Sequence, residues 1–369
     1  MKRVTAVLLC AGFAFNTFAT KSRILSMGKH DAFFMDEVSV FRNPANVSIY
    51  PNLLMGSYGE FRVRPEDTAS DAQGEYAALR RTNRDPEDPF FGAILSYSLN
   101  QSSEAGNQYP MVSVGAVFNR KDPLLDYAAA DPKLYGAGVD GLDIAEPIGK
   151  TDLLFGYAFP NGGMIGVGTY LAWQKFTTKS TLQKETSLYK GTAGVNWPIA
   201  RSMDLEASVG IASLTAESGD TVLAEDDISV EADLRLFSAL TALNGDFVPH
   251  VGFKRVSLQK QKTAFLEVAG GLGLNINIDK GFFWAGIEGL YEQKERDLTG
   301  STVPDDSTGI GGRVSFGIER NLVWDWFVVR VGGQKEIMYT TANVDDGGWV
   351  ENKETDADND LVGDRKSVV

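Results

Sequence analysis

The residues best suited to bind a metal ion lie near the C-terminus, in a strongly acidic stretch. Asp356, Asp358 and Asp360 follow one another at intervals of two residues. Oxygen ligands at positions i, i+2 and i+4 are typical of calcium-binding loops. Such loops also need a glycine for their sharp turn, and Leu361 stands in its place. Calcium bound by the three aspartates is therefore one hypothesis, and a solvated acidic loop is the favoured one.

Residues for nucleophilic or acid–base catalysis are scarce. The chain has only two histidines, His30 and His250, and one cysteine, Cys10. Two histidines are too few for a histidine-rich metal centre, and there is neither a Gly-x-Ser-x-Gly elbow nor a phosphate-binding glycine loop. We therefore expect a protein that is not an enzyme and that uses no cofactor apart from the calcium considered above. A hydrolase using His250 with an unidentified serine is the minor alternative.

The composition excludes two classes of protein. With 49 acidic against 35 basic residues, the net charge of the 369-residue chain is −14, which argues against a nucleic-acid partner. After residue 20 there is no stretch of roughly 20 apolar residues, which excludes a helical membrane protein. The chain is nevertheless rich in glycine, with 39 residues, and its mean hydropathy is −0.15.

The N-terminus has the features of a secretory signal peptide. Lys2 and Arg3 precede an apolar run over residues 4–15, and residues 17–19 suit a small-residue cleavage site. We expect residues 1–19 to be removed, which leaves no cysteine in the mature protein. A lipoprotein signal that uses Cys10 is the weaker alternative, because Leu9 occupies the position where a small residue is needed.

The rest of the chain alternates apolar and polar residues with a period of two. In residues 264–278, Leu266, Val268 and Leu272 share one face, and Glu267 and Gly271 lie on the other. Similar patterns predict thirteen strands, at 52–63, 89–99, 109–119, 151–159, 163–176, 187–199, 203–215, 229–240, 247–260, 263–278, 281–292, 309–319 and 324–338. A fourteenth is expected to begin near Arg365 and to be incomplete.

The predicted connections alternate between long and short, as they do in outer-membrane barrels. Together with the signal peptide, the long strands and the strand-end aromatic residues, this predicts an all-β fold. Residues 52–369 would form one transmembrane antiparallel β-barrel of about 14 strands in the outer membrane of a Gram-negative-type bacterium. Its expected partners are membrane lipid and the barrel assembly machinery. The strand-end aromatic residues, which suit the two membrane interfaces, are Trp173, Trp197, Trp284, Trp324, Trp326, Tyr58 and Tyr291.

Two groups of residues are candidates for a functional role inside the barrel or at its mouth. Charged residues on the predicted inward face could form a polar path or fasten a plug, although a solvated interior is favoured: Glu206, Glu231, Asp233, Arg235, Glu267, Glu288, Arg313 and Glu319. The exterior loop 120–150 is unusually apolar and could receive a hydrophobic small-molecule ligand, or could fold over the barrel mouth. Its apolar residues are Leu124, Leu125, Tyr127, Leu134 and Tyr135.

Residues 26–61 resemble the start of the FadL-type outer-membrane transporters of long-chain fatty acids. The shared features are the acidic pair Asp36 and Glu37 and the sequence Asn43-Pro44-Ala45 before the first strand. In that family this region is a hatch that plugs a 14-stranded barrel. The resemblance implies that residues 20–51 form an N-terminal plug and that the protein is a passive transporter of hydrophobic small molecules. A periplasmic tail outside the barrel is the alternative for this segment.

The same opening is similar to that of the PorV-type barrels of type IX secretion, which implies protein secretion or cargo attachment as a second hypothesis. A structural or adhesive surface barrel is the third. The chain departs from the FadL-type pattern in having Lys29-His30 and Phe33-Phe34 where smaller residues are expected.

Overall fold

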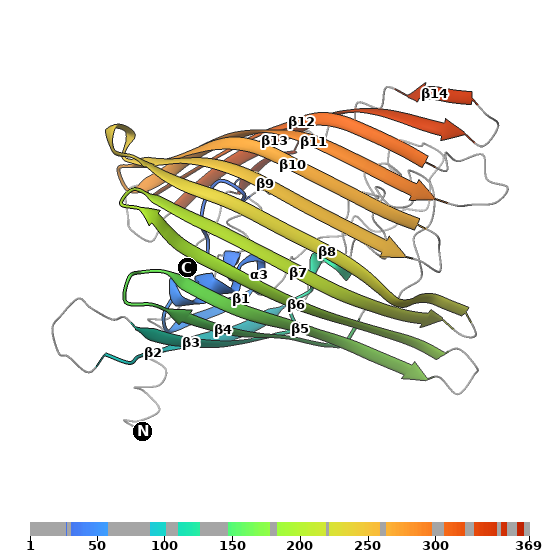
Figure 1. The fold of residues 1–369 in the computed structure, drawn as a ribbon, viewed down its shortest axis with the longest axis horizontal. Helices are drawn as coiled ribbons and strands as arrows, with labels where there is room; N and C mark the ends of the chain where they lie inside the picture. The colour runs from blue at the N-terminus through green and yellow to red at the C-terminus, as the bar shows by residue number, and fades with distance from the viewer. Residues whose placement is uncertain are drawn as a thin grey trace.

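A computed structural model describes residues 27, 31–57, 89–100, 110–125, 147–177, 183–218, 221–258, 263–296, 306–321, 328–344, 348–352 and 360–364. These residues form one antiparallel β-sheet preceded by a short helical segment (Figure 1). Its strands are β1 (Leu53–Ser57), β2 (Phe90–Ser98), β3 (Met111–Phe118), β4 (Gly149–Ala158), β5 (Met164–Thr177), β6 (Gln183–Ala200), β7 (Met203–Ser218), β8 (Thr221–Leu240), β9 (Gly245–Leu258), β10 (Thr263–Ile278), β11 (Gly281–Arg296), β12 (Asp306–Asn321), β13 (Val328–Val344), β14 (Gly348–Asn352) and β15 (Asp360–Asp364).

The strands are hydrogen-bonded in chain order from β1 to β14, each antiparallel to the next. The thirteen strands predicted from the alternating pattern are confirmed as β1 to β13. Prediction and structure agree on both bounds of β10. Elsewhere the strands are often longer than predicted, and β8 reaches 20 residues.

The two faces of the sheet differ as the period of two requires. On β7, Ile211 is 56% exposed, whereas Glu206, on the opposite face, is 1% exposed. On β10, Leu272 is 51% exposed and Ala269 is buried. We call the face with Glu206 and Ala269 the concave face, because the sheet curves toward it (Figure 1). The other is the outer face.

The predicted alternation of connection lengths is weaker in the structure. The seventh connection was expected over residues 216–228, but β7 extends to Ser218 and β8 begins at Thr221. The polar residues there suggested a loop, yet strand pairing uses the backbone and tolerates polar side chains at the end of a sheet. Several connections on the opposite end are tight turns, one of which places Asn244 in the left-handed region at φ 50°.

Residues 365–369 lie outside the described residues, so the last strand expected to begin near Arg365 stays a prediction, but the acidic region before it contains two strands that were not predicted. Within the region expected to be the final loop, β14 pairs with residues 340–344 of β13, and β15 pairs with residues 330–334 of the same strand. The two short strands therefore follow one another along the free edge of β13. They were missed because two short apolar runs, at Trp349-Val350 and Leu361-Val362, lie in a stretch dominated by acidic residues.

The N-terminal segment (residues 31–50) lies inside the curve of the sheet (Figure 1). It contains the α-helix α3 (Ser39–Arg42) and the 3-10 helix η2 (Pro44–Ser48). Val47 of η2 packs in a hydrophobic cluster with Met55 of β1, Ile94 of β2 and Leu154 of β4. No helix in the described ranges is long and apolar enough to span a membrane. Between the described residues of β1 and those of β14 and β15, no pairing is present.

Candidate functional site: the N-terminal segment and the polar row of the concave face

The Asn43-Pro44-Ala45 sequence begins η2 and ties it to the sheet. Asn43 is extended, at φ −126° and ψ 102°, as the residue before a proline should be. Its side-chain oxygen accepts a hydrogen bond from the Ala45 backbone N–H at 3.1 Å, which caps η2. Its Nδ2 donates to the Val195 carbonyl of β6 at 3.0 Å. The Asn43 side chain thus caps η2 and also binds it to the sheet.

Glycines of the concave face make room for this segment. A Cβ atom at Gly166 of β5 would overlap the backbone of Pro44 and Ala45, and one at Gly194 of β6 would overlap the Asn43 side chain. On the opposite side of the curve, Cβ atoms at Gly273 and Gly286 would overlap the Phe33 ring. The glycine content of the strands therefore allows the backbone and aromatic rings of the N-terminal segment to approach the sheet closely.

Arg235 joins the sheet to the N-terminal segment. Its guanidinium, fully buried, makes two 2.7 Å bonds from Nη2 to the carboxylate of Glu206, its cross-strand neighbour. Its Nη1 donates to the carbonyl oxygens of Asp31 and Phe34, at 3.1 and 3.0 Å, and contacts that of Ala32 at 3.4 Å. The charged pair is therefore desolvated, and the hydrogen bonds made by both Nη atoms of Arg235 offset part of the cost of burying it.

The second half of the segment is fastened through Asn46. Its Nδ2 donates to Glu206 Oε1 at 3.0 Å and to Ser39 Oγ at 3.1 Å, and its Oδ1 accepts from Asn196 Nδ2 at 3.4 Å. All of these side chains are buried. Glu206 thus binds both Arg235 and Asn46, and so connects the two strands β7 and β8 to η2.

Arg42, the last residue of α3, adds a further set of contacts. Its Nη1 donates to Asp31 Oδ1 at 3.0 Å, and its Nε lies 3.7 Å from Asp233 Oδ1. Burial by itself would lower the pKa of Arg42, but Asp31 and Asp233 raise it above its usual value, so the side chain remains charged. Arg42 closes the segment on itself and links it to β8.

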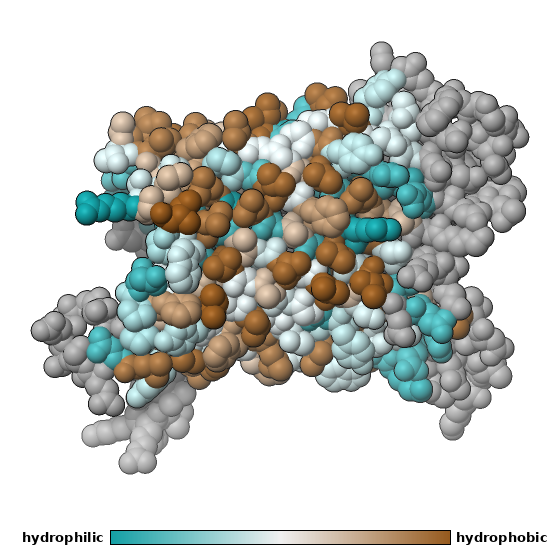
Figure 2. All heavy atoms as spheres, in the orientation of Figure 1, coloured by the Kyte–Doolittle hydropathy of each residue, from teal (hydrophilic) through white to brown (hydrophobic). Residues whose placement is uncertain are grey.

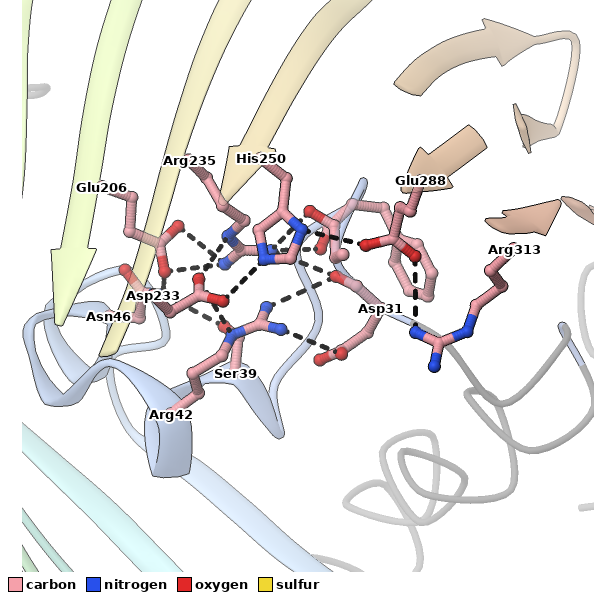
Figure 3. A network of polar contacts seen from close by, with 12 residues as sticks. Asp31, Ser39, Arg42, Asn46, Glu206, Asp233, Arg235, His250, Glu288 and Arg313 are labelled. Atoms are coloured by element: carbon pink, nitrogen blue, oxygen red, sulfur yellow. Dashed lines mark hydrogen bonds and ion pairs between the residues drawn. The ribbon is translucent and has the colours of Figure 1, made fainter. Parts of the chain in front are cut away.

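Seven residues in register across β7 to β13 form a polar row on the concave face. Each residue of this polar row is the cross-strand partner of the next. In order they are Glu206, Arg235, His250, Gly271, Glu288, Arg313 and Glu336. His250 lies between two carboxylates, with Nε2 2.8 Å from Asp233 Oδ2 and Nδ1 3.1 Å from Glu288 Oε1 (Figure 3). Arg313 then pairs with Glu288 at 3.4 Å and with Glu336 at 2.9 Å.

Gly271 lets the row continue across β10. A Cβ at this position would overlap the Glu288 side chain, which here reaches past β10 to contact His250. Any larger residue would separate these two partners. A glycine is therefore needed at position 271 because side chains of β9 and β11 meet over it, and not because the backbone turns there.

An aromatic cluster fills the space beside the polar row. Phe33 and Phe34 pack against Trp284 of β11 with ring centroids 6.2 and 5.4 Å apart, and Phe34 also contacts Phe282. Phe33 meets the His250 ring edge-on at 6.1 Å. These two phenylalanines stand where the FadL-type pattern has smaller residues, and the ring of Phe33 fits over Gly273 and Gly286. The prediction that Trp284 lies at a membrane interface is wrong, because its side chain is fully buried on the concave face.

The remaining predicted site residues are placed as follows. Asp36 is buried and Glu37 partly buried just before α3, and their carbonyls accept from the backbone N–H groups of Ser39 and Val40. Glu231 pairs with Lys190 of β6, and Glu319 with Arg330 of β13 at 2.7 Å. Glu267 lies near Arg313. All eight charged residues predicted to point inward are on the concave face.

The segment between β3 and β4 begins by turning into the curve of the sheet, and we call residues 119–125 the inward loop. Leu124 and Leu125 are buried against Leu188, Leu214 and Phe265 of the concave face. Of the two alternatives for this loop, an apolar surface that receives a ligand and a loop that folds over the barrel mouth, the burial of these two leucines fits the second. Tyr127, Leu134 and Tyr135 lie outside the described residues.

Charged residues anchor the inward loop. Arg120 binds Asp152 of β4 through Nε at 2.8 Å and Nη2 at 2.6 Å, and Asp122 accepts from Lys190 at 3.4 Å. Burial would raise the pKa of Asp122, but Lys190 and Arg120 lower it to about 2. Tyr170 accepts from the Asp122 N–H and donates to the Arg120 carbonyl.

The described residues contain no group of three or more histidine, cysteine or acidic side chains arranged to hold a metal ion. Of the three aspartates considered for calcium, Asp356 and Asp358 lie outside the described residues, and Asp360 is the first residue of β15. The signal peptide, Cys10, Tyr58, Trp324 and Trp326 are also outside them. Comparison with family models, curated proteins and solved structures gives no match to this chain.

Proposed function

We propose that this chain is an outer-membrane β-barrel that allows hydrophobic small molecules to pass, with the N-terminal segment as its internal plug. The apolar outer face supports a membrane location. Leu95, Ile165, Ile211, Ile287 and Ile310 are among the large apolar side chains exposed on it. Figure 2 shows apolar residues distributed along this side of the sheet. Soluble monomers rarely expose so much apolar surface, whereas a lipid-facing wall requires it.

The strand arrangement supports closure. An open sheet edge in lipid would leave backbone N–H and C=O groups without partners, which costs several kcal/mol for each group. In this sheet one unpaired edge belongs to β1, and the other lies on the β14 and β15 side. We propose that these two edges meet in the membrane and close a barrel of fourteen strand positions, with β14 and β15 sharing the last.

The N-terminal segment fits the role of a plug. Irregular backbone is tolerated at membrane depth only when protein or water surrounds it. This segment makes its polar contacts with concave-face residues such as Arg235 and Glu206 and with the Val195 carbonyl. It also contacts glycines on both sides of the curve, at Gly194 and Gly286.

The proposal that the ligand is hydrophobic rests on an apolar cluster on the concave face. Away from the N-terminal segment, Leu188, Leu214, Val256 and Phe265 point to the inside of the curve rather than toward lipid. The interior of a water-filled pore is usually polar. An apolar interior above a plug instead favours a compartment for a hydrophobic molecule, which would take the place of Leu124 and Leu125 of the inward loop against this cluster.

Uptake of a hydrophobic fluorescent probe into proteoliposomes tests this function. We expect uptake above that of protein-free liposomes, and we expect Leu214→Asn to reduce the protein-dependent part several-fold. Leu290→Asn is the matched control, because Leu290 is a buried concave-face leucine in a separate cluster. Uptake no greater than that of protein-free liposomes, or an equal loss in both variants, would contradict the proposal.

A further inference from the structure

The N-terminal segment and the inward loop, which we call the two insertions, meet inside the curved sheet, where a side chain of one contacts a ring of the other. The N-terminal segment comes from the end where β1 begins, and the inward loop from the end where β3 finishes. Arg120 of the inward loop places its guanidinium carbon 4.1 Å from the centroid of the Phe41 ring in α3. A cation held over an aromatic face at this distance is an attractive contact, and it is stronger when both groups are shielded from water.

Each partner of this contact is held by its own surroundings. Phe41 packs against the cluster that contains Val40, Val47 and Leu154. Arg120, whose side chain is 11% exposed, is fixed by two bonds to Asp152. Its guanidinium also lies 5.2 Å from the Tyr170 ring centroid.

The anchors of the inward loop extend to several strands. Asp152 belongs to β4 and Tyr170 to β5, while Asp122 reaches Lys190 of β6, which in turn pairs with Glu231 of β8. A movement of the inward loop away from this wall would carry Arg120 with it. Phe41 would then lose its cationic partner.

We propose that Arg120 is a positioning residue that couples the inward loop to the N-terminal segment, so that release of either one favours release of the other. The inference rests on the proposed function in treating the curved sheet as a closed barrel. A coupling free energy between two sites is reciprocal, so a change made at one end must appear with the same factor at the other. This reciprocity separates coupling from a merely structural role for Arg120.

Cysteine labelling can measure the opening of each insertion separately. In a Cys10→Ser background, Ser48→Cys reports on the N-terminal segment and Leu124→Cys on the inward loop. Ser48 is 2% and Leu124 7% exposed, so both reporters should react slowly with a maleimide in the folded protein in micelles. The unboiled, folded band on a gel restricts the measurement to folded molecules.

We expect Arg120→Gln to accelerate labelling of the Ser48→Cys reporter by roughly 3- to 30-fold, the range of a shielded cation–π contact. Phe41→Leu should accelerate labelling of the Leu124→Cys reporter to a similar degree, although it alters nothing in the inward loop. With Phe41→Leu already present, Arg120→Gln should have no further effect on the Ser48→Cys reporter. Phe41→Tyr, which keeps the ring, should restore slow labelling.

Arg330→Gln is the matched control, because Arg330 makes a similarly shielded pair with Glu319 that joins β12 to β13 rather than joining the two insertions. Arg330→Gln should leave the labelling rates of both reporters unchanged. If Phe41→Leu leaves the Leu124→Cys reporter unchanged, the insertions are independent and the proposal is wrong. Should Arg120→Gln fail to fold, the comparison of Phe41→Leu with Phe41→Tyr decides the matter. Labelling requires no transported molecule, so failed probe uptake with intact coupling would overturn the proposed function alone.

Discussion

Arg235 connects the sheet and the N-terminal segment more directly than any other side chain in the polar row. It neutralises Glu206 on the neighbouring strand and donates to backbone carbonyls on either side of Phe33. The pair is costly to desolvate, and its hydrogen bonds to the segment offset that cost. The structure of residues 31–34 therefore depends on a charge located more than 200 residues further along the chain.

Removing only one member of this pair should destabilise the protein strongly. Arg235→Met leaves the Glu206 carboxylate buried without its cation, and we expect a loss of about 3–5 kcal/mol in the free energy of unfolding. Adding Glu206→Gln should recover a large part of that loss. Denaturant unfolding in micelles, followed by tryptophan fluorescence, measures both. Equal stability of Arg235→Met and wild type would contradict the role assigned to the pair.

A single methyl group should displace the N-terminal segment while leaving the sheet intact. In Gly194→Ala the new Cβ would overlap the Asn43 side chain, whereas a Cβ at Gly191 of the same strand would meet nothing within 4 Å. We expect faster protease cleavage within residues 31–50 in Gly194→Ala and no change in Gly191→Ala. The same cleavage rate in both variants would show that Asn43 does not need this glycine.

At the scale of the elements, the two insertions divide the concave face between them. The N-terminal segment covers the polar row and the aromatic cluster, and the inward loop covers the apolar cluster around Leu188 and Leu214. Each is held by charged side chains that are largely shielded from water. Asp122, in the inward loop, has a lowered pKa of about 2.

The inward loop should lose stability in acid. Because the pKa of Asp122 is lower in the folded state than its ordinary value of 3.8, its contribution is fully present above pH 4 and is lost as the pH falls toward 2. Asp122→Asn should thus be about 2 kcal/mol less stable than wild type at pH 6, and this gap should narrow toward pH 2. The free energy of unfolding of both proteins, measured at pH 6 and near pH 2, checks this prediction. A difference in stability that does not change with pH would contradict it.

The sequence predicted the elements better than it predicted the contacts. The alternation in residues 264–278 is so regular that both ends of β10 could be placed, whereas the aspartates between β14 and β15 hid two strands. Inward-facing charges were identified by parity, and the same parity could have found Asp152 and Lys190. The contacts between Asp31 and Arg235, and between Phe41 and Arg120, depend on how the sheet curves, which no local pattern reports.

At the scale of the whole molecule, the average composition of the chain is explained by two faces of the sheet that differ in polarity. The mean hydropathy of −0.15 combines an apolar outer face with a concave face that contains glycines, ion pairs and a buried apolar cluster. This division is opposite to that of a soluble protein, in which polar side chains face outward. It is the arrangement that a closed, plugged barrel in a membrane requires.

The central claim, that the sheet closes into a membrane barrel, is tested most directly by the gel migration of the full-length protein from a membrane fraction, with and without boiling. A closed barrel keeps its hydrogen-bonded wall in detergent until it is heated, so we expect the unboiled protein to migrate differently from the boiled protein. Identical migration of the boiled and unboiled samples would contradict a closed barrel.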